Sequence, residues 1–170
     1  MYRVPIYKVS LVRDGSIRAG SETPESVDRK SGRSISSSRD AAALVREYLR
    51  DADREHFVVI MLDTKGRPIG INTVSTGTLN ASLVHPREVF KPAILCNSAA
   101  IILAHNHPSG DPTPSREDRE STKRLVEAGE LLGINVLDHV IIGDEGKHIS
   151  FAEAGYLQVT KNSLDARTSP

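Results

Sequence analysis

Hydrophobic and polar residues alternate at the start of the chain and then give way to a long polar stretch. Residues 4–12, VPIYKVSLV, alternate as in a strand with one buried face. The next four residues, RDGS (13–16), contain the Asp-Gly dipeptide that is typical of a tight hairpin turn. Residues 20–38 are rich in serine and have no apolar period, as in a surface loop or mobile arm. The pattern predicts an N-terminal hairpin and polar arm over residues 1–38.

The apolar period changes in the middle of the chain. Residues 39–52 follow a serine cap and place apolar side chains on one stripe, which predicts an amphipathic helix. The run HFVVIMLD (56–63) predicts a buried strand, and IGINTVSTG (69–77) predicts a second strand after the turn TKGRP. We expect these two strands to form a central hairpin. The helical stripe consists of Leu44, Val45, Tyr48 and Leu49.

Helices and strands alternate in the second half of the chain. One helix is expected to begin at Pro86, because a first helical turn tolerates proline, and AAIILAH (99–105) predicts a buried strand. A long helix is expected from Ser115 to Gly133, followed by the strand INVLDHVIIG (134–143). The residues expected on the inner faces of these two helices are Val89, Ala93 and Ile94 in the first, and Thr122, Leu125, Val126, Gly129 and Leu132 in the second.

This alternation predicts the α/β fold class. Strands interleaved with helices bury their apolar faces best in a single three-layer domain, with one mixed β-sheet flanked by helices. We expect that domain to cover residues 39–160 and to be followed by a C-terminal tail over residues 161–170.

Composition narrows the possible partners and compartments. A chain of 170 residues suits one domain that buries about 70% of its unfolded surface without the help of a metal or a disulfide. Its single cysteine, Cys96, excludes an internal disulfide and a zinc site built from several thiolates, and a reducing cytoplasm is the expected compartment. Lys+Arg and Asp+Glu are equal at 22 each, so nucleic-acid binding is possible but charge gives it no support.

Membrane association is not expected. The start of the chain lacks the apolar block of a secretory signal. The longest apolar runs, FVVIML and AAIILA, are too short to span a bilayer.

Two histidines and an aspartate form a candidate metal site. His105 and His107 stand at positions i and i+2 at the end of a predicted strand, so their side chains share one face if extended backbone reaches residue 107. A loop rich in proline and glycine then returns the chain to a helix at Ser115, which can bring Asp118 over the histidines. Two neutral imidazoles and one carboxylate suit zinc, with a fourth position left open for water. An open position is typical of a catalytic site.

Each part of this pattern also has a structural explanation. Ser115 and Asp118 have the spacing of a helix-capping box, and a His-x-His pair at a strand end occurs in ordinary exposed positions. The combination favours the metal site, because only six of the 170 residues are histidine and two of them share one face of a buried strand. Asp111 is an alternative ligand if Asp118 faces solvent, and His139 is expected to be a hydrogen-bonded sheet residue and not a fourth ligand.

The segment HNHPSGDPTPSREDRESTKRL resembles the signature of the RadC-like proteins, a bacterial branch of the JAMM (JAB/MPN) metalloprotease-like superfamily. That signature is a distant glutamate, then His-x-His, seven residues, and Ser-x-x-Asp, and all of it is present. The resemblance extends over about residues 50–152. It implies a JAB/MPN domain with a partly curled sheet, related in its layers to the cytidine deaminases.

The resemblance also implies roles for individual residues. His105, His107 and Asp118 would bind zinc, Ser115 would help to stabilise an oxyanion, and Glu55 would be the general acid/base. The implied reaction is zinc-dependent hydrolysis of an amide bond in a peptide or protein substrate, at a peptide or isopeptide linkage.

Residue chemistry alone does not separate Glu55 from two other glutamates, Glu88 and Glu117. The family pattern favours Glu55, because it lies at the start of the strand that follows the first helix of the domain.

Three other enzyme classes fit the chain less well. In an HNH nuclease the named residues are spread through a ββα metal fold, whereas here they are consecutive. A zinc deaminase needs a Pro-Cys-x-x-Cys motif, and this chain has one cysteine. A non-haem iron oxygenase with a His/His/Asp site usually has a jelly-roll barrel, which the alternation of strands and helices argues against.

A binding module that keeps the metal without turnover is the remaining alternative. RadC-like proteins carry a DNA-repair label, and longer members have an N-terminal helix-hairpin-helix region that is not found in this sequence. The complete set of Glu, His, His, Ser and Asp favours an active site, because a module without turnover has no evident need for Glu55.

Overall fold

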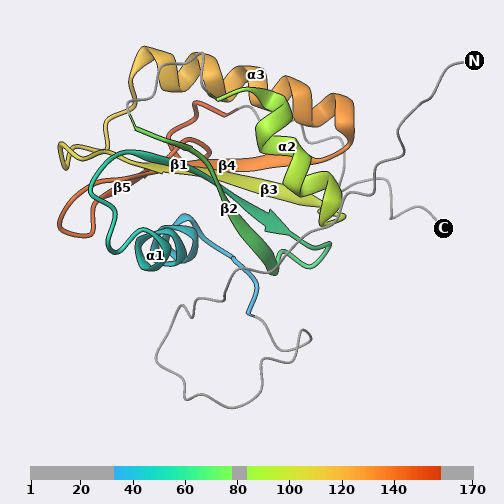
Figure 1. The fold of residues 1–170 in the computed structure, drawn as a ribbon, viewed down its shortest axis with the longest axis horizontal. Helices are drawn as coiled ribbons and strands as arrows, with labels where there is room; N and C mark the ends of the chain where they lie inside the picture. Colours follow the sequence, from blue (N-terminus) through green and yellow to red (C-terminus); the bar gives the residue numbers. More distant parts are fainter. Residues whose placement is uncertain (1–32, 78–83, 158–170) are drawn as a thin grey trace, which may run out of the picture.

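The structure is a computed structural model of the 170-residue chain and describes residues 33–77 and 84–157 (Figure 1). The predicted N-terminal hairpin and the predicted tail over 161–170 lie outside the described residues. None of the helices in the described ranges has the length and apolar character that are needed to span a lipid bilayer.

The elements expected between residues 39 and 143 are confirmed, most of them within one or two residues. Helix α1 ends earlier than expected, at Tyr48, where Leu49 caps it by donating its backbone N–H to the carbonyl of Val45. A short strand follows at the end of the domain. In chain order the described elements are α1 (Ser38–Tyr48), β1 (His56–Leu62), β2 (Pro68–Thr76), α2 (Pro86–Leu95), β3 (Ala100–Asn106), α3 (Arg116–Leu132), β4 (Asn135–Ile142) and β5 (His148–Ser150).

The strands form one mixed sheet in the order β2-β1-β3-β4-β5. Strands β3 and β4 are parallel and are joined through α3, and the other neighbouring strands are antiparallel. The hairpin predicted as central therefore contributes β1 to the interior of the sheet and β2 to its edge. Among the described residues the sheet is open, with β2 and β5 at its two edges.

Helices cover both faces of the sheet, as a three-layer α/β domain requires (Figure 1). Successive side chains of a strand point to opposite faces, so each interior strand serves two cores. In β1, Phe57, Val59 and Met61 pack on the side of α2 and α3. The alternate residues, such as Val58 and Ile60, pack on the side of α1. Burial on both faces explains why β1 and β3 are continuous apolar runs in the sequence.

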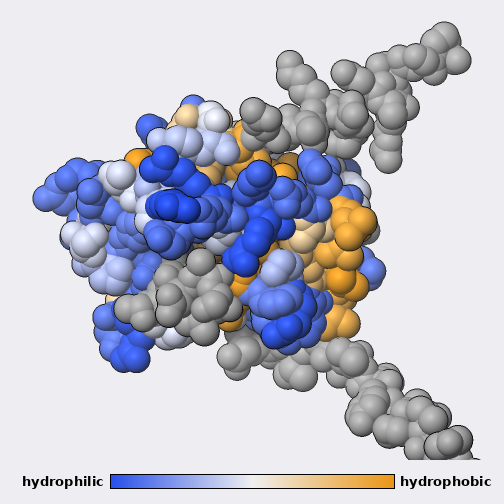
Figure 2. All heavy atoms as spheres, turned by 90° about the horizontal axis from the view of Figure 1, so that it is seen from above, coloured by the Kyte–Doolittle hydropathy of each residue, from blue (hydrophilic) through white to orange (hydrophobic). Residues whose placement is uncertain are grey.

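Two residues expected on inner helical faces are exposed. Ile94 in α2 is 51% exposed and Leu132 in α3 is 47% exposed. Helix α3 ends at Leu132 with Gly133 as its C-cap, and Ile134 packs into the core at this end of the helix instead. In Figure 2, which views the molecule from the side of α3, the surface is mostly hydrophilic with an apolar area toward the end where α3 finishes.

The end of α3 is defined by two glycines. Gly133 has φ +69° and donates its N–H to the carbonyl of Glu130, while Ile134 donates to the carbonyl of Gly129, which is the hydrogen-bond pattern of a Schellman motif. A Cβ atom on Gly129 would lie 2.5 Å from the backbone oxygen of Ile134 and 3.2 Å from Phe90. Gly129 therefore allows α3 to pack closely against the segment that leads into β4.

We predict that Gly129→Ala destabilises the fold although alanine favours helix. The added methyl group meets a backbone carbonyl that cannot move independently, and overpacking of this kind costs about 1–3 kcal/mol. The free energy of unfolding from urea denaturation measures the effect. Leu131→Ala is the control, because Leu131 is 89% exposed on the same turn and its loss is expected to change stability by less than about 0.5 kcal/mol. Equal stability of the two variants would contradict close packing at Gly129.

Asp63 organises the turn between β1 and β2. Its carboxylate accepts hydrogen bonds from the Arg67 side chain (Nε, 2.7 Å) and from the backbone N–H groups of Arg67 and Lys65. The hydrogen bond from the Arg67 guanidinium is the main reason that the pKa of Asp63 falls from 3.8 to about 2.

The lowered pKa of Asp63 predicts a pH dependence of stability. The ionised carboxylate favours the folded state at pH values above 3.8, and this contribution is lost as the pH falls toward 2, because the unfolded chain then takes up the proton first. Asp63→Asn is expected to lose less unfolding free energy than the wild type when the pH falls through this range. Urea denaturation at each pH measures this loss. An unchanged pH dependence in Asp63→Asn would show that the turn does not need the charge.

Candidate metal centre

The two histidines of the motif share the face of the sheet that α3 covers. In β3, Ile101 and Leu103 point into the core beneath α2 and α3, and His105 continues the same alternation. The backbone N–H of His107 donates to the carbonyl of Ile142 in β4, so sheet pairing extends one residue beyond β3. The Nε2 atoms of the two histidines lie 2.9 Å apart. The strand itself ends at Asn106, and the imidazoles of His105 and His107 still meet, as their spacing predicts.

The loop after the histidines fixes His107 through a backbone carbonyl. The Nδ1–H group of His107 donates to the carbonyl of Asp111 at 2.7 Å. The carboxylate of Asp111 is exposed and accepts hydrogen bonds from the backbone N–H and hydroxyl of Thr113. The backbone carbonyl of Asp111 thus orients His107 through Nδ1. The Asp111 carboxylate is used by Thr113, so the structure does not favour Asp111 as a substitute ligand.

Asp118 caps a helix and faces the histidines at the same time. Its Oδ2 atom accepts from the backbone N–H of Ser115 at 2.7 Å and from the Ser115 hydroxyl at 2.6 Å, and Ser115 Oγ accepts from the Asp118 N–H, which completes a capping box. Its Oδ1 atom lies 3.3 Å from Nε2 of His105, and Oδ2 lies 3.8 Å from Nε2 of His107. The capping box and the approach to both imidazoles therefore coexist in one carboxylate.

Glu55 reaches the same point from the start of β1. Its Oε1 atom lies 4.0 Å from Nε2 of His105, and the side chain is mostly buried. One ligand atom from each of Glu55, His105 and His107 lies within 4.8 Å of the other two, so this group can hold a metal ion. The two competing glutamates are elsewhere: Glu88 pairs with a lysine within α2, and Glu117 is exposed on α3.

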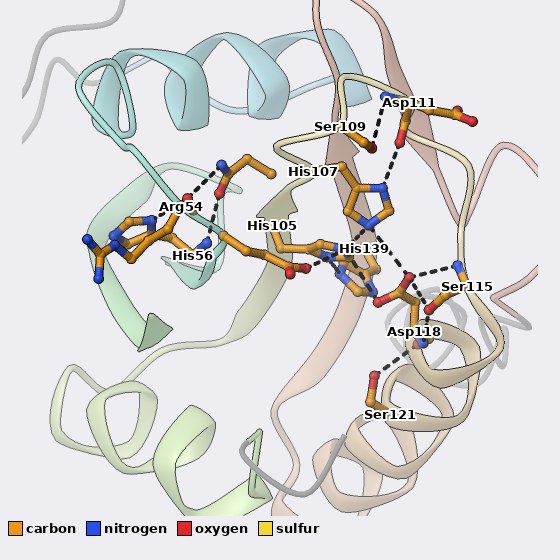
Figure 3. A network of polar contacts seen from close by, with 12 residues as sticks. Arg54, His56, His105, His107, Ser109, Asp111, Ser115, Asp118, Ser121 and His139 are labelled. Atoms are coloured by element: carbon orange, nitrogen blue, oxygen red, sulfur yellow. Dashed lines mark hydrogen bonds and ion pairs between the residues drawn. The ribbon is translucent and has the colours of Figure 1, made fainter. Parts of the chain in front are cut away.

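A buried chain of hydrogen bonds determines which nitrogen of His105 carries hydrogen. The Thr122 hydroxyl lies 2.6 Å from the carbonyl of Asp118, which has no hydrogen to give, so the hydroxyl donates. The 2.6 Å contact between this hydroxyl and Nδ1 of His139 is then donated by His139, whose Nε2 is left as an acceptor. Nδ1 of His105, 2.8 Å from that Nε2, must carry the hydrogen. The Nε2 atom of His105 therefore presents a lone pair to the site. Figure 3 shows His105, His107, His139 and Asp118 gathered there.

Burial keeps these two histidines neutral. Desolvation lowers the pKa of His105 to about 4, against a smaller opposing effect of Asp118, and lowers the pKa of His139 well below its ordinary value. Phe57 stacks against the His105 ring at 5.9 Å and meets the His139 ring edge-on at 5.4 Å, which makes this wall of the site apolar.

The donor set fits a metal ion. His107 uses its Nδ1 hydrogen on Asp111, as His105 does on His139, so two Nε2 atoms with lone pairs face each other at 2.9 Å and need a positive charge between them, either a proton or a metal ion. Two ligands of one tetrahedral zinc lie about 3.4 Å apart. The two Nε2 atoms lie 2.9 Å apart, and Asp118 approaches them with different oxygens, Oδ1 at 3.3 Å from His105 and Oδ2 at 3.8 Å from His107.

Sequence comparison agrees with this arrangement. A model of the RadC-like JAB domain matches residues 35–156. The chain belongs to this family. It is 61% identical over 123 residues to the UPF0758 protein TTE0897 of Caldanaerobacter subterraneus subsp. tengcongensis, an alignment that covers 72% of this chain and 52% of the relative.

Two further relatives of this chain come from other organisms. A UPF0758 protein of Rubrobacter xylanophilus is 57% identical over 133 residues, covering 78% of this chain and 58% of the relative. A UPF0758 protein of Methanosarcina acetivorans is 52% identical over 126 residues, covering 74% and 55%. The chain spans about half the length of these curated relatives.

Two polar residues of the RadC-like JAB domain support the histidines in ways that the sequence did not reveal. His139 was expected to be a hydrogen-bonded sheet residue, which is confirmed, but its partner is His105 itself. Thr122 was expected on the inner face of α3 because of the helical spacing alone. In the structure its hydroxyl forms a hydrogen bond with His139. The sequence signal for both residues is that they are polar but occupy positions that the apolar pattern assigns to the core.

We predict that His139→Leu weakens metal binding. The substitution leaves the buried Nδ1–H of His105 without an acceptor, and loss of a partner that orients a ligand typically lowers affinity by about 10–100-fold. Chelator competition with Zn²⁺ or Co²⁺ measures the affinity, and His139→Gln, which can still accept, is expected to lose less.

The control for this prediction is His148→Leu. His148 bonds Ser38 on the other side of the sheet and does not contact the site, so its loss is expected to leave affinity unchanged. Unfolding of the metal-free proteins checks that each variant folds. Affinity of His139→Leu equal to that of His148→Leu would show that His105 does not need this partner.

Proposed function

We propose that this RadC-like JAB domain is a zinc-dependent hydrolase of amide bonds, of the JAMM type, acting on a peptide or isopeptide linkage in a peptide or protein substrate. One observation carries the proposal: the Nε2 atoms of His105 and His107 and the Asp118 carboxyl group face one another, and a second carboxyl group, that of Glu55, lies 4.0 Å from Nε2 of His105.

His105, His107 and Asp118 are the residues that would hold the zinc ion. Their two nitrogens and one carboxylate oxygen form a donor set that suits zinc and leaves room for a further ligand. Zinc, when bound, acidifies water and polarises a carbonyl group, which is the chemistry that amide hydrolysis needs.

Glu55 is the proposed proton carrier. Its carboxylate takes the proton of the attacking water and returns it to the nitrogen of the leaving amine, so that no charged amide nitrogen is expelled. The structure supports this assignment in two ways: Glu55 comes from a different element than the three proposed ligands, and its Oε1 atom approaches the same Nε2 without belonging to the capping box.

Ser115 is the proposed donor to the oxygen of the tetrahedral intermediate. In this arrangement its hydroxyl hydrogen is donated to Oδ2 of Asp118, so donation to a substrate requires the hydroxyl to turn away from that carboxylate. Ser115 is exposed, and its backbone N–H also bonds Asp118 and would keep the helix capped during this rotation.

The test combines metal content with turnover. We expect zinc at one ion per chain and hydrolysis within a library of peptides and isopeptides. Glu55→Gln is expected to lower the turnover number by about 10²–10⁴-fold while zinc remains bound, because general acid–base catalysis contributes about this factor. Glu88→Gln, a substitution on the surface of α2, is the matched control and should retain full turnover.

Two outcomes would contradict the proposal. Equal turnover by wild type and Glu55→Gln would remove Glu55 as the proton carrier. Absence of turnover together with DNA binding that is sensitive to salt and unaffected by chelator would favour a binding module.

A further inference from the structure

Asn106, the residue between the two histidines, reaches across to the segment that carries Glu55. Its Oδ1 atom accepts from the backbone N–H of His56 at 2.8 Å, and its Nδ2 atom donates to the backbone carbonyl of Arg54 at 3.0 Å. These two bonds therefore hold the backbone of the residues immediately before and after Glu55. Figure 3 shows Arg54 and His56 beside the two histidines.

These side-chain bonds occur where pairing of the backbones stops. The ladder between β1 and β3 ends at Phe57 and His105. Beyond that pair, the amide of Asn106 supplies one acceptor and one donor to β1, in the places that a further backbone residue would have filled. A third bond, from the N–H of Gly77 to the carbonyl of Glu55 at 2.8 Å, holds the segment from the other side.

Only a side-chain amide of this length satisfies both groups. A backbone N–H needs an oxygen and a backbone carbonyl needs a donor, so the amide orientation is fixed by its partners. Aspartate at position 106 would keep the acceptor but lose the donor, and leucine, which is similar in shape, would lose both.

We propose that Asn106 is a positioning residue for Glu55. It fixes the backbone on either side of Glu55, so the carboxylate is held toward Nε2 of His105. The three consecutive residues 105–107 thus supply the two histidines and also position the glutamate. This inference rests on the proposed function only in the role that it gives to Glu55. Because misplacement of a reacting group by about 1 Å can cost on the order of 100-fold in rate, we expect Asn106→Asp to lower the turnover number by about 10–100-fold.

The decisive measurement is whether Asn106 acts through Glu55. With Co²⁺ as the probe, Glu55→Gln and Asn106→Asp are each expected to change the visible absorption spectrum. Asn106→Asp is expected to add no change in spectrum or turnover when Glu55→Gln is already present. Asn72→Asp is the matched control, because Asn72 lies in β2 and its side-chain amide donates to the carbonyl of the adjacent Thr73, and it should leave the spectrum unchanged.

An effect of Asn106→Asp that persists in full in the Glu55→Gln background would overturn the inference, since Asn106 would then act through the histidines. Wild-type turnover and spectrum in both Asn106→Asp and Asn106→Leu would also overturn it.

Amide hydrogen exchange separates this inference from the proposed function. The N–H of His56 is expected to exchange faster in Asn106→Leu and to stay protected in Asn106→Asp, whether or not the protein hydrolyses any substrate or binds cobalt. Absence of turnover in every protein, wild type included, would count against the proposed function. The exchange rate of the His56 N–H would still show whether Asn106 holds the backbone beside Glu55. Full protection of His56 in Asn106→Leu would overturn it.

Discussion

The site depends on the hydrogen-bond chain that runs from the carbonyl of Asp118 through Thr122 and His139 to His105. This chain joins α3, β4 and β3, and it leaves the lone pair of His105 directed at the site. It is buried against an apolar wall that includes Phe57, where an unsatisfied polar group would be costly, so each member holds the next in a single orientation. The helix, the strand and the site are therefore positioned by the same contacts.

Asp118 shows that a structural and a functional explanation of one motif need not exclude each other. Ser115 and Asp118 form a capping box, as the spacing alone suggests, and this box uses one carboxylate oxygen. The other oxygen faces His105 because α3 begins above the carboxyl end of β3. The cap thus orients the carboxylate as well as starting the helix.

Much of this arrangement could be predicted from local sequence patterns. The two-residue period of a strand places His105 and His107 on one face, and the return of the chain at Ser115 places Asp118 near them. His139 could not be assigned in the same way, because its contact with His105 depends on the parallel register that pairs it with Leu103. The role of Asn106 depends likewise on where the β1–β3 ladder ends. Such contacts are set by tertiary pairing, so the local sequence does not show which groups these residues contact.

The presence of both Glu55 and Asp118 beside a buried imidazole has a consequence for how the site would hold an ion. Two carboxyl side chains approach His105, and burial lowers the pKa of His105 to about 4, so this imidazole adds no positive charge near neutral pH. In surroundings of low polarity an unbalanced charge is strongly unfavourable. A cation bound at this point would therefore be held by the carboxyl oxygens as well as by the nitrogen of the buried imidazole.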